Sequence, residues 1–141
     1  MDYASKTASM ILDILTNDIT EENNHKKIDN SNSRFMPVVV EHVGNANNGD
    51  FISIAHYYEQ NGDLMADPEI VFWRKKNECP SHFPSKFVYF PISYRQDGLG
   101  INRELVIFEN GKPVRFNIKL KNDTTKFVTM WMLNIKDQQN L

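Results

Sequence analysis

The sequence contains a single cysteine, Cys79, among its 141 residues, so it cannot form a disulfide within the chain. Long apolar runs are absent as well: the stretch from Phe35 to Val40 is interrupted by Pro37, whereas a membrane-spanning helix needs about 20 apolar residues. No basic segment followed by an apolar stretch and a small-residue cleavage site opens the chain, as it would in a secretory signal. These absences predict a soluble, cytoplasmic protein that does not bind membranes.

A strong excess of one charge is missing too. The formal net charge is −2, whereas a domain that grips nucleic acid through phosphates usually carries a clear excess of lysine and arginine. The charge is nevertheless uneven, because residues 35–75 contain six acids against two bases and residues 76–141 contain ten bases against six acids. The first segment therefore predicts an acidic surface, and the second leaves room for a local basic patch.

The chain divides into three parts by composition. Residues 1–16 predict a short docking helix, because apolar residues such as Ile11 and Leu15 recur at three- and four-residue spacing. Residues 17–34 are polar and rich in asparagine, which predicts a flexible linker. Residues 35–141 have enough apolar and aromatic side chains for a single folded domain of ordinary size.

Strand and turn patterns indicate the fold class of that domain. The pairs Asn61-Gly62 and Asn110-Gly111 favour the positive φ angles of tight hairpin turns. Residues 114–120 alternate apolar and polar side chains, which predicts a strand, and a helix is expected from Asn122 or Asp123 onward. The apolar side of this helix includes Trp131. The prediction is an α+β fold, a mostly antiparallel β-sheet with an N-terminal and a C-terminal helix packed on it.

The densest group of polar side chains lies in the hairpin from His56 to Glu69. If its carboxylates are exposed, they form an acidic protein-binding surface together with one more acid on the preceding strand. Alternatively the carboxylates only solvate a hairpin tip, or a subset with His56 serves a metal-dependent enzyme. The proposed protein-binding residues are Glu41, Glu59, Asp63, Asp67 and Glu69, and the alternative catalytic set is His56, Glu59, Asp63 and Asp67.

Two other residue groups define further alternatives. Cys79 and His82 are three positions apart, a spacing that lets both reach one zinc ion, but a complete site needs two more ligands. His56 is a weak third candidate, and no metal or other cofactor is expected. Nucleic acid is the alternative partner for the basic half of the chain, whose candidate residues are Lys112, Arg115, Lys119, Lys121 and Lys126.

Three strings carry a family resemblance: HYYEQNGDLMADPE at residues 56–69, FPISYRQDGLGINRE at residues 90–104 and W-x-x-N-I-K-D-Q-Q at residues 131–139. The chain resembles an uncharacterised domain family of small proteins encoded by phages, plasmids and conjugative elements of bacteria. The resemblance transfers no catalytic residue, and what it implies is the context of an accessory protein that binds and disables host machinery. No enzymatic activity is expected. The partner that it implies is a bacterial protein such as a restriction or CRISPR nuclease, so that the chain would serve counter-defence as an anti-CRISPR or anti-restriction inhibitor.

Overall fold

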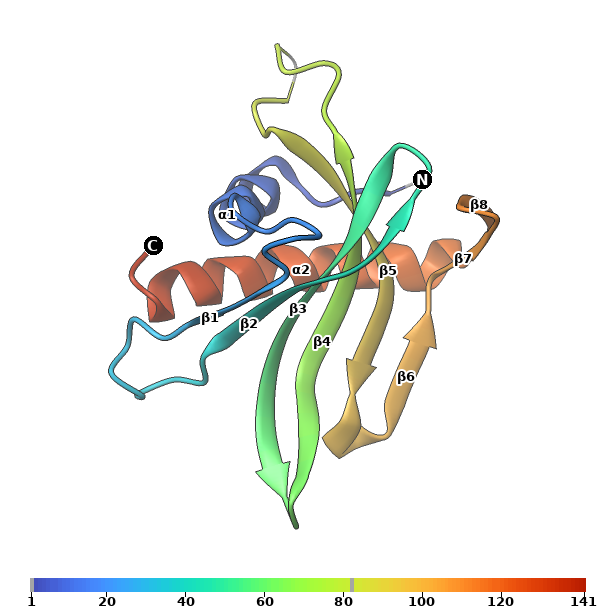
Figure 1. Ribbon diagram of the computed structural model, residues 1–141. Coiled ribbons are helices and arrows are strands. Elements are labelled where there is room, and N and C mark those ends of the chain that lie inside the picture. The colour runs from blue at the N-terminus through green and yellow to red at the C-terminus, as the bar shows by residue number, and fades with distance from the viewer. Residues whose placement is uncertain (1, 82) are drawn as a thin grey trace.

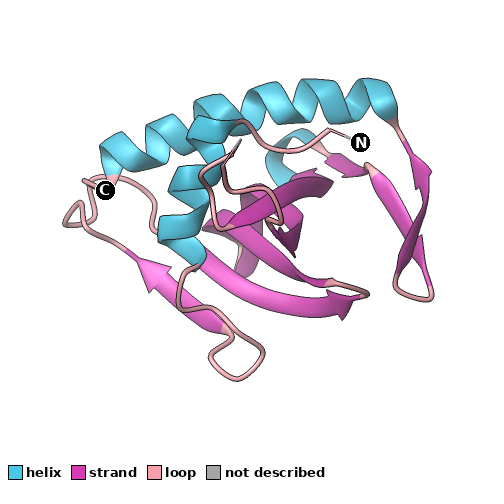
Figure 2. Ribbon diagram, turned by 90° about the horizontal axis from the view of Figure 1, so that it is seen from above, coloured by secondary structure: helices cyan, strands magenta, loops and turns pink. Residues whose placement is uncertain are grey.

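Two helices cover one face of an antiparallel sheet in the computed structural model, which describes residues 2–81 and 83–141 (Figures 1 and 2). The predicted α+β fold is thereby confirmed. The elements are α1 (Lys6–Thr16), β1 (His25–Ile28), β2 (Val38–Ala46), β3 (Gly49–Gln60), β4 (Asp63–Lys76), β5 (Phe87–Gln96), η1 (Asp97–Leu99), β6 (Ile101–Glu104), β7 (Val106–Glu109), β8 (Lys112–Phe116) and α2 (Ile118–Gln138).

The larger sheet is an antiparallel meander in which the six strands β1 to β6 lie in chain order. The predicted turns are present, with positive φ angles at both residues of Asn61-Gly62 and of Asn110-Gly111. The second of these turns joins β7 to β8 in a separate hairpin. In Figure 2 the long helix runs along the top of the view and the short helix extends from it at a steep angle toward the strands, and one face of the sheet carries no helix.

The core lies between the helices and the sheet. Alternation along the central strands turns every second side chain toward the helices, as period-2 geometry requires. α1 is amphipathic and part of this core, since its apolar stripe is fully buried. The buried apolar side chains include Ala8, Ile11, Leu12, Leu15, Val38, Val40, Ile52, Ile54, Ile70, Phe72, Tyr89, Val128, Trp131, Met132 and Ile135.

The predicted flexible linker over residues 17–34 is wrong in part, because His25–Ile28 forms the edge strand β1 on β2. Ile19 is 1% exposed and therefore anchors the segment in the core. The amide of Asn30 donates a hydrogen bond to the buried side chain of Gln139, 2.6 Å away. The segment is ordered by backbone pairing and by the single contacts of Ile19 and Asn30. Neither kind of contact requires the apolar periodicity that marks a helix or strand in a sequence.

Arg74 on β4 fixes the end of α1 to the sheet. Its guanidinium forms a bidentate pair with Asp50, at 2.9 and 2.7 Å. The same group donates to the carbonyls of Thr16 and Ile19, at 3.0 and 2.9 Å, and it lies 4.7 Å from the centre of the Phe87 ring. This buried arginine thus satisfies carbonyls at and beyond the end of α1 that lack partners within the helix.

The C-terminal helix begins earlier than predicted. β8 ends at Phe116, and the side chain of Asn117 accepts a hydrogen bond from the amide of Leu120 at 3.1 Å. This cap starts α2 at Ile118, so the end of the predicted strand over residues 114–120 is helical. An alternating pattern of four residues fits a helical turn as well as a strand, which explains the error.

Trp131 packs α2 onto the core, with 5% of its surface exposed. Its ring stacks on Phe127 at 6.0 Å and meets His56 edge-on at 5.6 Å. We expect Trp131→Ala to lower the free energy of unfolding by about 3–5 kcal/mol, because it leaves a large cavity. Urea denaturation measures the change. Met130→Ala is the control, because Met130 is exposed on the same helix and should cost less than about 0.5 kcal/mol.

Arg74→Met tests the arginine contacts. Because the substitution removes the arginine that pairs with Asp50 and donates to the carbonyls of Thr16 and Ile19, we expect a loss of about 3–5 kcal/mol in urea denaturation. Lys76→Met, at the exposed end of the same strand, provides a control for the loss of one positive charge. Equal effects of the two substitutions would show that Arg74 does not hold α1 in place.

Candidate protein-binding face of the sheet

The face of the sheet opposite α1 and α2, here called the open face, carries a group of polar side chains from four adjacent strands. The strand register pairs Glu41 on β2 with Ser53 on β3. It also pairs Glu69 on β4 with Arg95 on β5. Tyr57 lies on the same face of β3, four residues beyond Ser53. The group therefore arises from cross-strand neighbours that are far apart in the sequence.

Glu69 is the centre of this group. Its Oε2 accepts hydrogen bonds from the hydroxyls of Ser53, at 2.7 Å, and of Tyr57, at 3.2 Å. Its Oε1 lies 3.5 Å from the guanidinium of Arg95. Burial and the neighbouring Glu69 raise the pKa of Tyr57 to about 12, so the phenol stays protonated and keeps donating at neutral pH. The network fixes the position of the Tyr57 ring.

Tyr57 also lines a groove of about 370 Å³ at the β3–β4 end of the open face, which we call the Tyr57 groove. The groove contains two carboxylates and the rings of two tyrosines. Lys27 and His25 on the edge strand β1 line its far side. The remaining lining comes from the apolar side chains of Pro37, Val39 and Leu64, and the polar and aromatic members are Glu41, Tyr57, Tyr58 and Glu59.

The acidic residues singled out in the sequence do not form one surface. Glu41 and Glu59 line the Tyr57 groove, and Glu69 is engaged in the adjoining network. Asp63 is exposed at the tip of the β3–β4 hairpin. Asp67 accepts a hydrogen bond from the side chain of Gln96 and therefore lies apart from the groove.

The alternative catalytic set is dispersed as well. His56 packs beneath α2, where its Nδ1 donates to the carbonyl of Pro37 at 2.9 Å. Glu59 lines the groove on the open face, and Asp63 is exposed at the hairpin tip. The structure therefore does not bring the four members together as the enzyme hypothesis requires.

The zinc hypothesis gains no support from the positions that the structure describes. Within residues 2–81 and 83–141, no three histidine, cysteine, aspartate or glutamate side chains are placed to hold a metal ion. Cys79 is exposed in the loop between β4 and β5. His82, its proposed partner, lies outside the described residues.

The basic candidates separate into exposed and buried groups. Lys112 and Arg115 on β8 and Lys119 and Lys126 on α2 are exposed. Lys121 is only 1% exposed, and its Nζ donates to the carbonyl of Pro91 at 3.3 Å. It therefore cannot belong to a solvated phosphate-binding patch, as the sequence hypothesis supposed.

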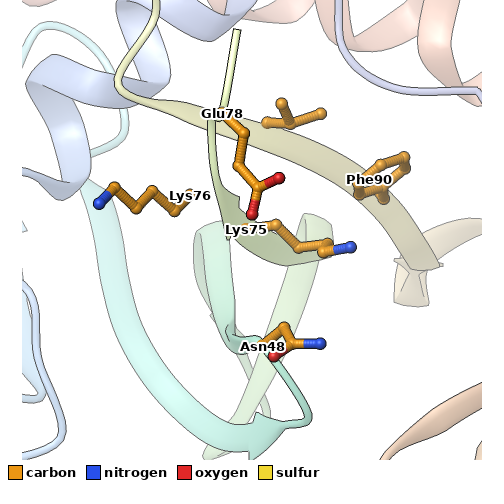
Figure 3. Close-up of a pocket in the computed structure, with 6 residues that line it drawn as sticks. Asn48, Lys75, Lys76, Glu78 and Phe90 are labelled. Carbon is orange, nitrogen blue, oxygen red and sulfur yellow. The ribbon is translucent and has the colours of Figure 1, made fainter.

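A basic groove at the other end of the open face was not anticipated from the sequence. This groove of about 500 Å³ is lined by Asn48, Lys75, Lys76, Glu78, Val88 and Phe90 (Figure 3). An adjoining groove shares Asn48 and Lys75 with it and extends to Lys112. The side chains of Lys75 and Lys76 extend in opposite directions in Figure 3, so their charges do not converge on one point. The Lys75 ammonium lies 4.7 Å from the centre of the Trp73 ring.

Sequence reasoning also missed Ser53 and Arg95 in the open-face network. Both contact Glu69, which lies on a different strand. The strand register that brings them together depends on irregularities in the pairing of β3 with β4 and of β4 with β5. The detectable signal was the alternation of β3, which places Ser53 and Tyr57 on one face.

Comparison with known proteins places this chain in a family. The family model described as "Domain of unknown function (DUF6908)" matches residues 6–141, so the chain belongs to this family. The match includes α1, which lies outside the three strings that carry the sequence resemblance. No curated protein and no solved structure shows a significant match. In the described part of the chain, no helix has the length and apolarity to cross a membrane.

His56 should make stability depend on pH. Burial lowers its pKa, so on acidification the unfolded chain takes up a proton before the folded one does. The contribution of neutral His56 is complete above about pH 6.5 and is lost as the pH falls through the lower folded-state pKa. His56→Gln should therefore reduce the difference in unfolding free energy between about pH 7.5 and about pH 5. His25→Gln, at an exposed position, is the control, and an equal effect of both substitutions would contradict the assignment.

Proposed function

We propose that the chain is a non-enzymatic protein-binding module that holds a lysine or arginine side chain of its partner in the Tyr57 groove. The observation that carries the proposal is the placement of Glu41 and Glu59 beside the rings of Tyr57 and Tyr58. Tyrosine supplies a large contact area at low entropic cost and is enriched among residues that dominate binding energy. The two carboxylates add charge complementarity for a basic side chain.

The network beneath the groove supports this reading. Glu69 accepts a hydrogen bond from the Tyr57 hydroxyl, and Ser53 and Arg95 hold Glu69 in position. The Tyr57 ring is therefore already ordered before a partner binds. Preorganisation of this kind improves affinity by reducing the entropy lost on association. Lys27 and His25 on the far side of the groove would disfavour a uniformly basic surface, so the proposal concerns a single basic side chain rather than a polycation.

The partner class follows from the sequence resemblance. Small proteins of phages, plasmids and conjugative elements act in the bacterial cytoplasm, where restriction and CRISPR nucleases present basic grooves for nucleic acid. A module with carboxylates beside tyrosines can hold one lysine or arginine at the edge of such a groove and obstruct it, without having to match the whole basic surface. We therefore extend the proposal to inhibition of a host defence nuclease, as an anti-CRISPR or anti-restriction protein.

Binding of a nucleic-acid strand is the second candidate function. One observation favours it: the groove of Figure 3 combines Lys75 and Lys76 with the Phe90 ring, and the adjoining groove reaches Lys112. Lysines follow a phosphate backbone, and an aromatic ring can stack on a base. The divergence of Lys75 and Lys76 and the carboxylate of Glu78 in the same groove place this candidate second.

The protein-binding proposal predicts the effect of charge reversal. The purified chain is assayed against two nucleases, a CRISPR effector nuclease and a restriction enzyme. We expect it to inhibit DNA cleavage by at least one of them. Glu41→Lys combined with Glu59→Lys should weaken the inhibition by about tenfold or more, mainly through a slower association rate. Surface plasmon resonance with the inhibited nuclease measures that rate.

Glu21→Lys combined with Glu22→Lys is the matched control, because it makes the same change in net charge at exposed positions outside the groove. Thermal unfolding should change little in both variants, since Glu59, Glu21 and Glu22 are exposed and Glu41 is only half-buried, and exposed charges contribute little to stability. The proposal is contradicted if neither nuclease is inhibited, or if the two double variants lose inhibition equally.

A further inference from the structure

The edge strand β1 has one free side. In the larger sheet β1 lies at one end of the strand order, and within the described part of the chain it pairs only with β2 (Figure 1). The four side chains of β1 alternate between exposed and partly buried positions. An edge strand of this kind presents unpaired amide and carbonyl groups to which a further strand can bind.

The strand register shows which backbone groups of β1 are free. The amide of His42 donates to the carbonyl of Asn24 at 2.8 Å, so these two residues bond directly across the strands. Bonded and non-bonded pairs alternate along an antiparallel ladder. The backbone groups of Lys26 are therefore directed at β2, whereas the amides and carbonyls of His25 and Lys27 point outward. The hydrogen bonds found among the described residues include none to these outward groups.

The side chains of β1 divide between the two faces of the sheet in the same alternation. His25 and Lys27 are exposed on the open face, where both line the Tyr57 groove. Lys26 lies on the other face and pairs with Asp18 at 2.5 Å, so its charge is already balanced. Ile28 packs against the core on that same face. The free backbone groups therefore lie beside the exposed ammonium of Lys27 on one face and beside an apolar border on the other.

We propose that β1 binds an extended acidic segment of a partner protein, which adds to the sheet as a further strand antiparallel to β1. The residues of the segment opposite His25 and Lys27 exchange backbone hydrogen bonds with these two residues. A glutamate or aspartate opposite Lys27 pairs with its ammonium, and cross-strand pairs of opposite charge are stabilising. The residue opposite Ile28 lies on the helix-covered face, so an apolar side chain fits there.

Charge selects this partner over a second copy of the chain. Antiparallel pairing of two β1 strands centred on Lys26 places Lys26 opposite its own counterpart and Lys27 opposite His25. Like charges directly opposite destabilise a sheet, and lysine on an edge strand protects proteins against such self-pairing. An acidic segment replaces the repulsion by attraction. The inference goes beyond the proposed function, because the segment uses the backbone of β1 and needs no basic side chain in the Tyr57 groove.

Titration of the intact chain with a capped seven-residue peptide tests the proposal. The peptide alternates two glutamates with valines and threonines, and it contains no basic residue. At a peptide concentration of about ten times the dissociation constant, hydrogen exchange of the His25 and Lys27 amides should slow by about tenfold. The amide of Lys26 is already directed at β2, so its exchange should change much less. Solvent-exchange NMR measures these rates residue by residue.

N-methylated peptides provide matched controls for backbone pairing. Methyl groups on the two glutamate amides remove the donors directed at β1, so we expect the affinity to fall by about tenfold or more. Methyl groups on the valine amides, which face away from β1, should leave the affinity within about threefold of the parent value. A peptide with lysine in place of both glutamates should bind about tenfold or more weakly than the parent peptide.

Lys27→Glu tests the charge pairing in the chain itself. The variant should bind the glutamate peptide about tenfold more weakly and the lysine peptide more tightly. Lys126→Glu, at an exposed position on α2, makes the same charge change away from β1 and is the control. Thermal unfolding checks that both variants fold, and the comparison of peptides on the wild-type chain depends on neither.

Four results would each overturn the proposal. The first is the absence of slowed exchange at His25 and Lys27 with millimolar peptide. The second is equal affinity of the parent peptide and the peptide that is methylated on its glutamate amides. The third is an equal effect of Lys27→Glu and Lys126→Glu. The fourth is a dimer of the free chain in which the His25 and Lys27 amides are already protected, because a second copy would then cover β1.

Discussion

An ion pair between the buried Arg74 and the half-buried Asp50 ties the end of α1 to the sheet. Arg74 sits on a central strand and binds Asp50 together with the carbonyls of Thr16 and Ile19. A buried guanidinium is costly unless nearly all its donors are used, and here the partners come from both the sheet and the end of α1. The chain that leaves Ile19 leads directly to β1, so the same arginine sets the edge of the sheet and one wall of the Tyr57 groove.

The two faces of the sheet separate stability from recognition. The helix-covered face holds the apolar core, so its titratable groups, such as His56, are desolvated there. The open face carries no helix (Figure 2), and the polar side chains Glu41, Tyr57, Glu69 and Arg95 on this face are partly exposed, within reach of a partner. Its other end is partly closed by the β7–β8 hairpin, where Phe108 packs edge-on against Phe51 and Trp73 at 5.0 and 5.1 Å.

Local patterns predicted the fold well where the physical cause is itself local. The spacing of Ile11 and Leu15 predicted α1, and the two Asn-Gly pairs predicted hairpins. Helix periodicity and turn geometry depend on residues that are close together in the sequence, so both could be recognised. β1 was missed because an edge strand can be held by backbone hydrogen bonds to one neighbour with polar side chains. Its order depends on the distant contacts of Ile19 and Asn30, which no local pattern reveals.

The candidate site was predicted in part. The sequence identified Glu41 and Glu59, but it grouped them with Asp67, which the structure places elsewhere. The pairing of β3 with β4 shifts between Ala55 and Tyr57, and such an irregularity redirects side chains without a clear sequence signal. For the same reason the partners of Glu69, which are Ser53 and Tyr57 on β3 and Arg95 on β5, can be identified only when these three strands are aligned.

Amide chemical-shift mapping with a short peptide that contains one arginine flanked by neutral residues tests whether the Tyr57 groove holds a basic side chain. We expect salt-sensitive shifts confined to the backbone around the Tyr57 groove, in residues 25–28, 38–41 and 57–64. The same peptide with citrulline in place of arginine should cause little change there. Shifts that cluster around Lys75 and Phe90 instead, or shifts of equal size with both peptides, would contradict the account.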